Sequence, residues 1–179
     1  INDVSIVPSS YSTTVYDINN KQIAKLITSG SNRIKVSLDQ VPVHLRWAFI
    51  DTEDARFYEH NGIDIQGIGR AALIAVTTMH ATEGASTLTQ QVLKNNVFTD
   101  WTSENNFISS LKRKIQEQYL ALQLEKVTSK DTILEAYLNT INLGSNTLGV
   151  QAASLRYFNK DVSKITISES GVIAAITQN

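Results

Sequence analysis

Apolar residues alternate with polar ones only near the start of the chain, and elsewhere they recur every three or four positions. Two short alternating runs, separated by the turn pair Asn19–Asn20, predict a β-hairpin over Thr13–Ile27. A further alternating run, Arg33–Leu38, predicts a third short strand. The β structure is therefore expected within residues 1–40, as a small sheet at the edge of the molecule.

The rest of the chain shows helical periodicity, bounded by residues that are typical of helix starts and ends. The start signals are Pro42, Asp64, Thr87 with Gln90 three positions later, and Ser129, and the stop signal is Gly144. The predicted helices span Val43–Thr52, 64–80, 87–94, Phe107–Val127, 129–141, Val150–Phe158 and Glu169–Ile176. Segments 83–85 and 99–106 interrupt the pattern and are expected to be loops. The predicted fold class is mainly α with a small β appendage.

Composition narrows the classes of function. The 179 residues suit one domain, and 42% hydrophobic residues with only 2 prolines indicate a folded, helix-rich body. The net charge of −1 argues against a general nucleic-acid binder. Because the chain has no cysteine, disulfides and thiolate metal sites are excluded. The histidines His44, His60 and His80 are too far apart for a helix-borne zinc motif.

Neither a membrane span nor a signal peptide is visible in the sequence, since no apolar run is long enough. The chain starts at Ile1 and stops at Asn179, just after an apolar helix, so both ends look cut from a longer protein. We expect any membrane anchor or further domain to lie outside this sequence.

The densest cluster of candidate catalytic residues lies in Thr52–Ile65. Glu53, Asp54, Glu59 and His60 fall within eight positions, although only 18% of the chain is charged. A carboxylate that burial or a neighbouring acid makes more basic can take a proton from a sugar hydroxyl. Glu53 is thus a candidate general base at the mouth of a cleft. The alternative is an acidic helix end on the surface, with His60 as a hydrogen-bonded structural residue.

A second candidate site is the predicted helix start at 86–94. Its free backbone N–H groups and the hydroxyls of Ser86, Thr87 and Thr89 suit an anionic phosphate or a sugar. The side chains that follow on the same helix are Gln90, Gln91 and Lys94. An ordinary capped helix with a polar face is the alternative.

A third candidate is a charged face of the long helix, formed by Arg113, Lys114 and Glu117. Two cations and an acid can hold a diphosphate, directly or through a divalent ion bound by the carboxylate. A surface salt bridge between residues four apart would give the same spacing.

A fourth feature is an apolar group in and around the polar loop 99–106, formed by Val97, Phe98, Trp101 and Phe107. These side chains could dip into a membrane surface, where tryptophan is favoured. Core packing is the simpler explanation.

The order of five segments along the chain carries a family resemblance. They read T-E-D-A-R-F-Y-E-H-N-G-I-D, G-A-S-T-L-T-Q-Q-V-L-K-N, R-K-I-Q-E, I-L-E-A-Y-L-N-T-I-N-L-G and G-V-Q-A-A-S-L-R-Y-F-N-K. Together they resemble the five-motif signature of the peptidoglycan glycosyltransferases. This family occurs in bifunctional (class A) penicillin-binding proteins and in monofunctional wall transglycosylases. The motifs cover Glu53–Lys160.

The resemblance implies a lysozyme-like helical domain with a larger head and a smaller jaw next to the membrane. Residues 1–40 would form the β segment that packs on the domain, and residues 41–179 the glycosyltransferase domain, with the jaw at 95–112. Such a domain would work on the outer face of the bacterial plasma membrane, held there by an N-terminal anchor that this chain does not contain.

The reaction that the resemblance implies is the polymerisation of lipid II, a disaccharide-peptide on an undecaprenyl diphosphate carrier. The acceptor GlcNAc 4-hydroxyl would attack C1 of the donor MurNAc with inversion and release the lipid diphosphate. The implied partners are lipid II, the growing glycan strand, a phosphoglycolipid inhibitor such as moenomycin, and the membrane surface through the jaw.

The resemblance also assigns roles to residues of this sequence. Glu53 would be the general base, and Glu117 would assist at the diphosphate, directly or as ligand of Mg²⁺ or Mn²⁺. The residues implied to bind diphosphate and donor sugar are Lys94, Arg113, Lys114, Ser86, Thr87, Gln90 and Gln91. The first motif would be shaped by Asp54, Phe57 and His60. The scaffold would include Glu135, Asn139 and Tyr157.

One departure from the family pattern concerns the cations. Family members often carry a basic residue after the second motif, but nothing between Lys94 and Lys112 is Lys or Arg, which makes Lys112 a candidate substitute. A diphosphate leaves readily once its charge is offset, so cations near a single base fit transfer, whereas a hydrolase needs two opposed carboxylates. The remaining alternatives are a muramidase-type wall hydrolase and a non-catalytic module that binds lipid II.

Overall fold

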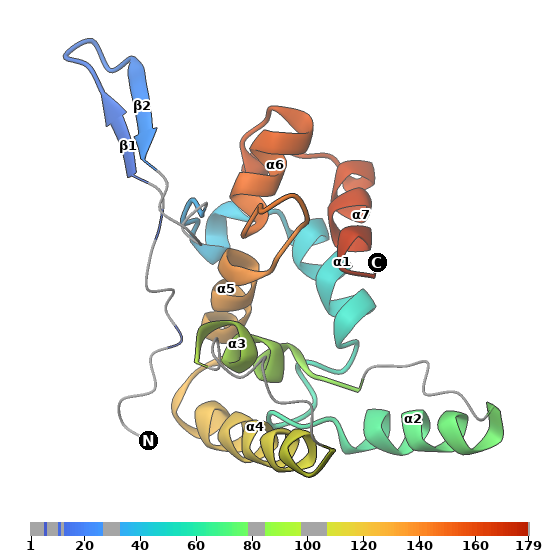
Figure 1. Ribbon diagram of the computed structural model, residues 1–179. Coiled ribbons are helices and arrows are strands. Elements are labelled where there is room, and N and C mark those ends of the chain that lie inside the picture. Colours follow the sequence, from blue (N-terminus) through green and yellow to red (C-terminus); the bar gives the residue numbers. More distant parts are fainter. Residues whose placement is uncertain are drawn as a thin grey trace.

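The computed structural model describes Ile6, Tyr11 and residues 13–26, 33–78, 85–97 and 107–178 (Figure 1). Within these residues the fold is mainly α, with seven α-helices and one β-hairpin, as the sequence predicts. The elements are β1 (Thr13–Tyr16), β2 (Gln22–Leu26), α1 (Val43–Glu53), α2 (Ile65–Thr78), α3 (Leu88–Asn96), α4 (Phe107–Val127), α5 (Lys130–Thr140), α6 (Val150–Phe158) and α7 (Ile167–Ala175), with short 3-10 turns η1 (Leu38–Gln40), η3 (Val162–Lys164) and η4 (Ile176–Gln178).

The predicted hairpin is present, with β1 and β2 paired antiparallel. Asp17 fixes the turn, because its carboxylate accepts hydrogen bonds from the backbone N–H groups of Asn19 and Lys21, each at 2.8 Å. Asn20 adopts a left-handed φ of 60°, which asparagine tolerates. The hairpin stands away from the helical body in Figure 1. Among the described residues up to position 40, Ile6 and Val36 are buried in the core and Leu38 packs against it.

The prediction of a third strand at Arg33–Leu38 is wrong. The backbone of Val36 pairs with the side-chain amide of Asn139 on α5, which accepts from its N–H at 2.9 Å and donates to its carbonyl at 2.8 Å. Two residues later, the backbone N–H of Leu38 donates to the carboxylate of Glu135, also on α5, at 2.8 Å. Side chains of a helix therefore satisfy the extended backbone that a neighbouring strand would otherwise satisfy.

The helix starts follow the predicted capping residues. Asp64 accepts from the N–H of Gly67, Ser129 accepts from the N–H of Thr132, and Thr87 and Gln90 form a reciprocal capping box. The last helix begins two residues before the predicted Glu169, at Ile167, because Thr166 caps it and Glu169 closes a capping box. Of the predicted helix and loop positions, Met79, His80, Glu83, Gly84 and residues 99–106 lie outside the described residues.

The hydrophobic core is centred on α5, which packs against α3, while α1 packs against α7. Tyr137 of α5 is fully buried and meets Phe49 of α1 edge-on, with ring centroids 5.7 Å apart. Leu45, Leu93 and Leu138 are also fully buried. These contacts fix the end of α1 relative to the start of α3, and both ends carry predicted site residues.

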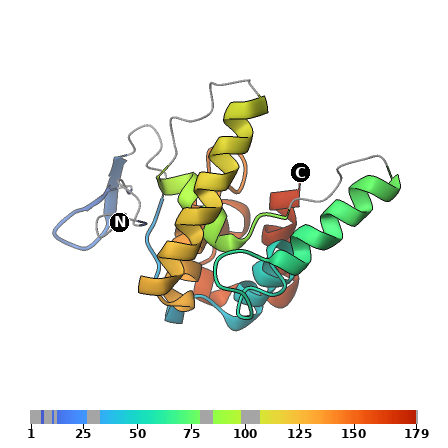
Figure 2. The same ribbon diagram turned by 90° about the horizontal axis from the view of Figure 1, so that it is seen from below.

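Apolar side chains of α2 and of the first half of α4 point away from the core, whereas Ala121 and Leu124 in the second half of α4 are buried in it. On α2, Ile65 and Val76 are each 79% exposed, although an apolar stripe on a helix usually faces the interior. On α4, Leu111 and Ile115 are exposed while the charged Glu117 is buried. Both helices lie at the end of the molecule opposite the hairpin, and Figure 2 looks onto that end.

Among the residues that the structure describes, no helix is long and apolar enough to cross a membrane. The predicted apolar group around the loop falls mostly outside those residues, because Phe98, Trp101 and the side chain of Phe107 are not described. The division of the chain at residue 40 and the jaw at 95–112 stay predictions.

Candidate active site

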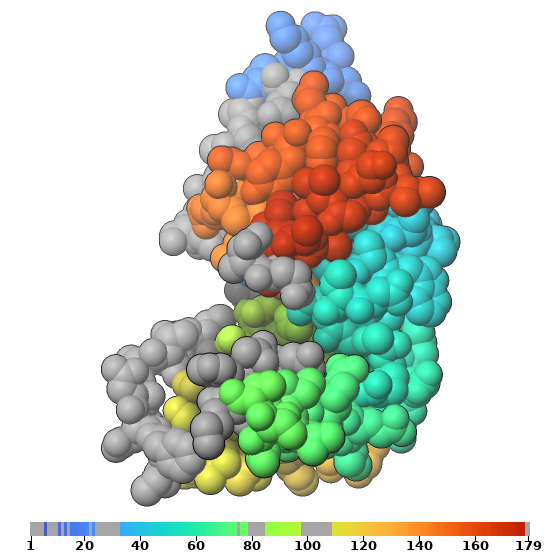
Figure 3. Space-filling model, turned by 90° about the vertical axis from the view of Figure 1, so that its right-hand side faces the viewer, coloured from blue at the N-terminus to red at the C-terminus, as the bar shows by residue number. Residues whose placement is uncertain are grey.

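The surface is hollowed between α7 and α2, with α3 at the back of the hollow (Figure 3). A pocket of about 350 Å³ lies there, built from the end of α1, the turn after it, the start of α2 and the segment before α3. Its lining residues are Asp51, Thr52, Glu53, Asp54, Ala55, Arg56, Asp64, Gly67, Arg70, Ala71, Ala85, Ser86 and Thr87. The first and second predicted motifs therefore share one pocket.

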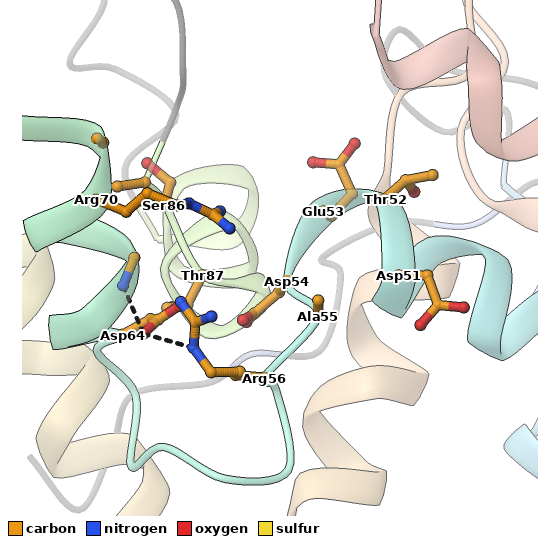
Figure 4. Close-up of a pocket in the computed structure, with 13 residues that line it drawn as sticks. Asp51, Thr52, Glu53, Asp54, Ala55, Arg56, Asp64, Arg70, Ser86 and Thr87 are labelled. Carbon is orange, nitrogen blue, oxygen red and sulfur yellow. Dashed lines mark hydrogen bonds and ion pairs between the residues drawn. The ribbon is translucent and has the colours of Figure 1, made fainter. Parts of the chain in front are cut away.

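Glu53 is the last residue of α1 and is half-buried at the pocket. Its carboxylate Oε2 accepts a hydrogen bond from Gln91 Nε2 at 2.9 Å, and its Oε1 accepts from the hydroxyl of Thr177. In Figure 4, Glu53 stands on one side of the pocket, and Arg70 and Ser86 stand on the other. Neutral donors from α3 and η4 thus hold the carboxylate, which faces the side of the pocket that carries Arg70.

A buried phenol lies close enough to Glu53 to feel its charge. Burial first, and then the charge of Glu53, raise the pKa of Tyr137 far above its ordinary value. The Tyr137 hydroxyl is buried and has no hydrogen-bond partner among the residues that the structure describes. The phenol therefore stays neutral beside the Glu53 carboxylate.

Asp54 is buried and links the end of α1 to the start of α3. It accepts from His60 Nε2 at 2.9 Å and from the backbone N–H of Leu88 at 2.9 Å. The N–H of Gly62 donates to His60 Nδ1 at 3.1 Å, so the imidazole proton is on Nε2 and the ring is neutral. Phe57 is fully buried and meets the His60 ring edge-on at 6.3 Å. These three side chains thus hold the first motif in place.

The third motif reaches the pocket through Lys114. Its Nζ donates to Ser86 Oγ at 2.7 Å and to Glu117 Oε1 at 2.9 Å, which brings α4 to the segment before α3. Glu117 is buried, at 8% exposure. Lys114, predicted to bind the diphosphate, therefore lies beside Ser86, and a buried acid holds its ammonium in position.

A metal fits this site poorly. No group of three or more His, Cys, Asp or Glu side chains that could hold a metal occurs in the described part of the chain. Glu117 is the candidate ligand, but its Oε1 already accepts from the Lys114 ammonium. One carboxylate that is already paired with a cation would need water or substrate phosphate oxygens to complete the octahedral shell of Mg²⁺. No step of the chemistry is therefore assigned to a protein-held metal.

Two arginines of the pocket were missed in the sequence, Arg56 and Arg70. Arg56 pairs with Asp64, with Nη2 to Oδ2 at 2.5 Å and Nε to Oδ1 at 3.2 Å. Partial burial acts to raise the pKa of Asp64, but this pairing and the Gly67 N–H outweigh it and lower the pKa. Arg70 lies on α2, six residues after the capping Asp64, and lines the pocket. The sequence contained a signal for Arg56, because this cation lies only three positions after the candidate base Glu53.

Other predicted binding residues lie outside the pocket lining. Gln90 is fully buried in the capping box with Thr87, so its side chain supports the helix start and is not available to a donor sugar. Lys94 is exposed on the last turn of α3. Arg113 is half-buried and Lys112 exposed on α4. The pocket itself brings together Glu53, Asp54, Ser86 and Thr87 of the predicted residues.

Comparison with known proteins agrees with this arrangement of motifs. The family described as Transglycosylase matches residues 19–179. The chain is 45% identical to penicillin-binding protein 1A of Clostridium botulinum over 169 residues, which cover 92% of this chain and 20% of that protein. It is 48% identical to penicillin-binding protein 1A of Escherichia coli over 147 residues, 80% of this chain and 16% of that protein.

A third relative is penicillin-binding protein 1A/1B of Bacillus subtilis, 41% identical over 178 residues, which are 99% of this chain and 18% of that protein. The chain therefore spans about a fifth of the length of these curated relatives.

Proposed function

The chain belongs to the transglycosylase family, and we propose that it polymerises lipid II into the glycan strands of peptidoglycan. The observation that carries the proposal is the polarity of the pocket, with the Glu53 carboxylate on one side and cations on the other. A sugar hydroxyl at Glu53 and a diphosphate at Arg70 and Ser86 would place the two reacting groups across one pocket of about 350 Å³.

In the proposed step, Glu53 takes the proton of the acceptor GlcNAc 4-hydroxyl as its oxygen attacks C1 of the donor MurNAc. The bond from C1 to the phosphate oxygen breaks on the opposite face, so the configuration inverts, and the diphosphate leaves with the electron pair. General-base catalysis of this kind contributes about 10²–10⁴-fold. Fixed cations offset the charge that develops on the leaving group.

The cations proposed to receive the diphosphate are Lys114, through its position beside Ser86, and Arg70 on the opposite wall from Glu53. Arg70 supplies the cation that the sequence lacks after the second motif. Lys94 and Arg113 are proposed to bind the more distant phosphate and a phosphoglycolipid such as moenomycin. A role for Mg²⁺ or Mn²⁺ at the diphosphate is implied only by the family resemblance.

The pocket favours transfer over hydrolysis, because a second acid is missing beside Glu53 among the described residues. Asp54 is bonded to His60 and to a backbone N–H, and Asp64 is paired with Arg56. Asp51 points away from Glu53 in Figure 4. A hydrolase with two opposed carboxylates would need one of these acids free and turned toward the pocket.

We also propose that the apolar faces of α2 and α4 rest on the outer face of the plasma membrane, where lipid II is anchored. Val76 of α2 is 79% exposed, and Ile115 of α4 is 57% exposed. Apolar side chains concentrated on two neighbouring helices at one end of a molecule are typical of an interfacial surface.

The test is incubation of the protein with labelled lipid II, followed by gel sizing of the glycan. We expect Glu53→Gln to abolish strand formation while lipid II binding stays within about threefold, since the side chain keeps its shape and loses its basicity. Asp51→Asn is the matched control, and it should retain turnover. Turnover of Glu53→Gln within a few-fold of the parent would remove Glu53 from its role, and soluble fragments from finished glycan would indicate a hydrolase.

A further inference from the structure

We propose that Thr177 is a positioning residue for Glu53, and that its hydroxyl selects Oε1 as the oxygen that takes the proton. This inference rests on the proposed function. Thr177 belongs to η4, which follows α7 directly, and lies 124 positions from Glu53 in the sequence.

The geometry gives Thr177 two acceptors and one proton. Its hydroxyl donates to Glu53 Oε1, and the carbonyl oxygen of Ala174 lies 2.8 Å from the same Oγ. A hydroxyl has a single proton and two acceptor lone pairs, so it serves one of these oxygens at a time. Rotation about the Cβ–Oγ bond of Thr177 turns its hydroxyl proton away from Glu53 Oε1 and toward the Ala174 carbonyl oxygen.

The amide nitrogen of Gln91, a second hydrogen-bond donor to Glu53, can donate but cannot accept. Gln91 Nε2 donates to Oε2 at 2.9 Å, and an amide nitrogen has protons to give but cannot accept one. Oε2 is therefore the oxygen suited to stay unprotonated, both before and after Glu53 takes the proton of the sugar hydroxyl. Oε1 suits the oxygen that gains a proton, because Thr177 can turn its own proton to Ala174 and then accept from an O–H on Oε1.

The proton and electrons balance across this step. The O–H bond of the acceptor sugar breaks and an O–H bond forms on Oε1. The electron pair of the sugar oxygen forms the new bond to C1, while the bond from C1 to the phosphate oxygen breaks and its electron pair leaves with the diphosphate. Thr177 neither gains nor loses a proton, so it acts through Glu53 as a positioning residue.

The frame that holds Thr177 in place is rigid enough for this role. α7 packs against α1, the helix that carries Glu53. His44 of α1 and Ser170 of α7 are joined by a hydrogen bond of 2.8 Å between Nδ1 and Oγ. Ile173 and Ala174, just before η4, are buried in the core.

The experiment compares Thr177→Val, Thr177→Ser and Thr140→Val in the lipid II polymerisation assay. Thr140 is the matched control, because it is a buried threonine whose hydroxyl donates to the helix carbonyl of Ala136 at 2.8 Å. We expect Thr177→Val to lower kcat about tenfold, the effect of about 1.4 kcal/mol in the barrier. KM should stay within about twofold, and Thr177→Ser should keep kcat within about threefold of the parent.

A spectroscopic measurement decides the contact without any turnover. The ¹³C carboxyl resonance of Glu53, identified by its loss in Glu53→Gln, should move at constant pH in Thr177→Val and stay in place in Thr140→Val. An unmoved resonance, or an unchanged kcat in Thr177→Val, would overturn the inference while the parent enzyme's activity still supports the proposed function. A parent protein that forms no glycan would instead count against the proposed function, and the resonance would still report on Thr177.

Discussion

The buried ion pair between Glu125 and Lys130 allows a quantitative test of how the site is held together. The pair joins the end of α4 to the start of α5 at 2.7 Å, with side-chain exposures of 4% for Glu125 and 21% for Lys130. Glu125 also accepts from the hydroxyl of Thr89 on α3 at 2.5 Å. The Lys130 ammonium lies 4.5 Å from the ring centroid of Phe57, in the first motif.

The loss in the free energy of unfolding depends on which charge of the pair remains buried without its partner. Lys130→Met leaves the Glu125 carboxylate buried with one hydroxyl donor, and removal of one partner of a buried pair costs about 3–5 kcal/mol. Glu125→Gln leaves the Lys130 ammonium, whose Nζ is itself buried over the Phe57 ring, so its cost should be of the same order, about 3–5 kcal/mol. The double variant leaves no buried charge and should recover a coupling free energy of about 2–3 kcal/mol.

The assays are urea unfolding and thermal unfolding, each followed by far-ultraviolet circular dichroism, on the parent, both single variants and the double variant. Because a change of 1 kcal/mol moves Tm by about 2–4 °C in a chain of this length, Lys130→Met should lower Tm by at least about 6 °C. Lys35→Met, at an exposed lysine, is the control and should change the free energy of unfolding by less than about 0.5 kcal/mol. A coupling free energy below about 0.5 kcal/mol would refute the reasoning, because the two charges would then be independent.

Two further predictions concern the buried phenol and the exposed helix face. Tyr137→Phe should raise the free energy of unfolding by about 1 kcal/mol, because it removes a buried hydroxyl without a described partner; a loss of similar size in the urea assay would mean that the hydroxyl is bonded. Ile115→Glu should lower the fraction of protein that floats with anionic liposomes about tenfold, because it places a charge in the apolar face of α4. Ile18→Glu, at the fully exposed hairpin turn, is the matched control, and equal flotation of the two variants would contradict the membrane contact.

The features that the sequence predicts well are local ones. The helix starts at Asp64, Thr87 and Ser129 depend on a side chain that bonds a backbone N–H three residues later, so the signal is contained in four positions. The position of Glu53 at the end of a helix was also predicted from neighbouring residues, whereas its role as general base stays a prediction. The Asn19–Asn20 pair likewise specified the hairpin turn.

The features that the sequence misses depend on partners far along the chain. The extended run at Arg33–Leu38 looks like a strand, but its partner is Asn139, 103 positions from Val36. The partners of Glu53 are Gln91 and Thr177, 38 and 124 positions away. Periodicity identifies a polar side chain at such positions, but it contains no information on which distant group that side chain meets.

The orientation of α4 shows how the two proposed roles of the domain depend on each other. Periodicity gives this helix an apolar and a charged face, and the usual expectation buries the apolar one. Here Ser86, in the segment before α3, accepts from Lys114, so the first half of α4 turns Lys114 and the buried Glu117 inward and leaves Ile115 outside. A helix that lies on the membrane by its outer face would thus hold its ammonium group within about one helix diameter, roughly 10 Å, of the lipid surface. The diphosphate of lipid II sits at that surface, so the same inverted helix that would contact the membrane would also bring the cation to the height of the bond to be broken.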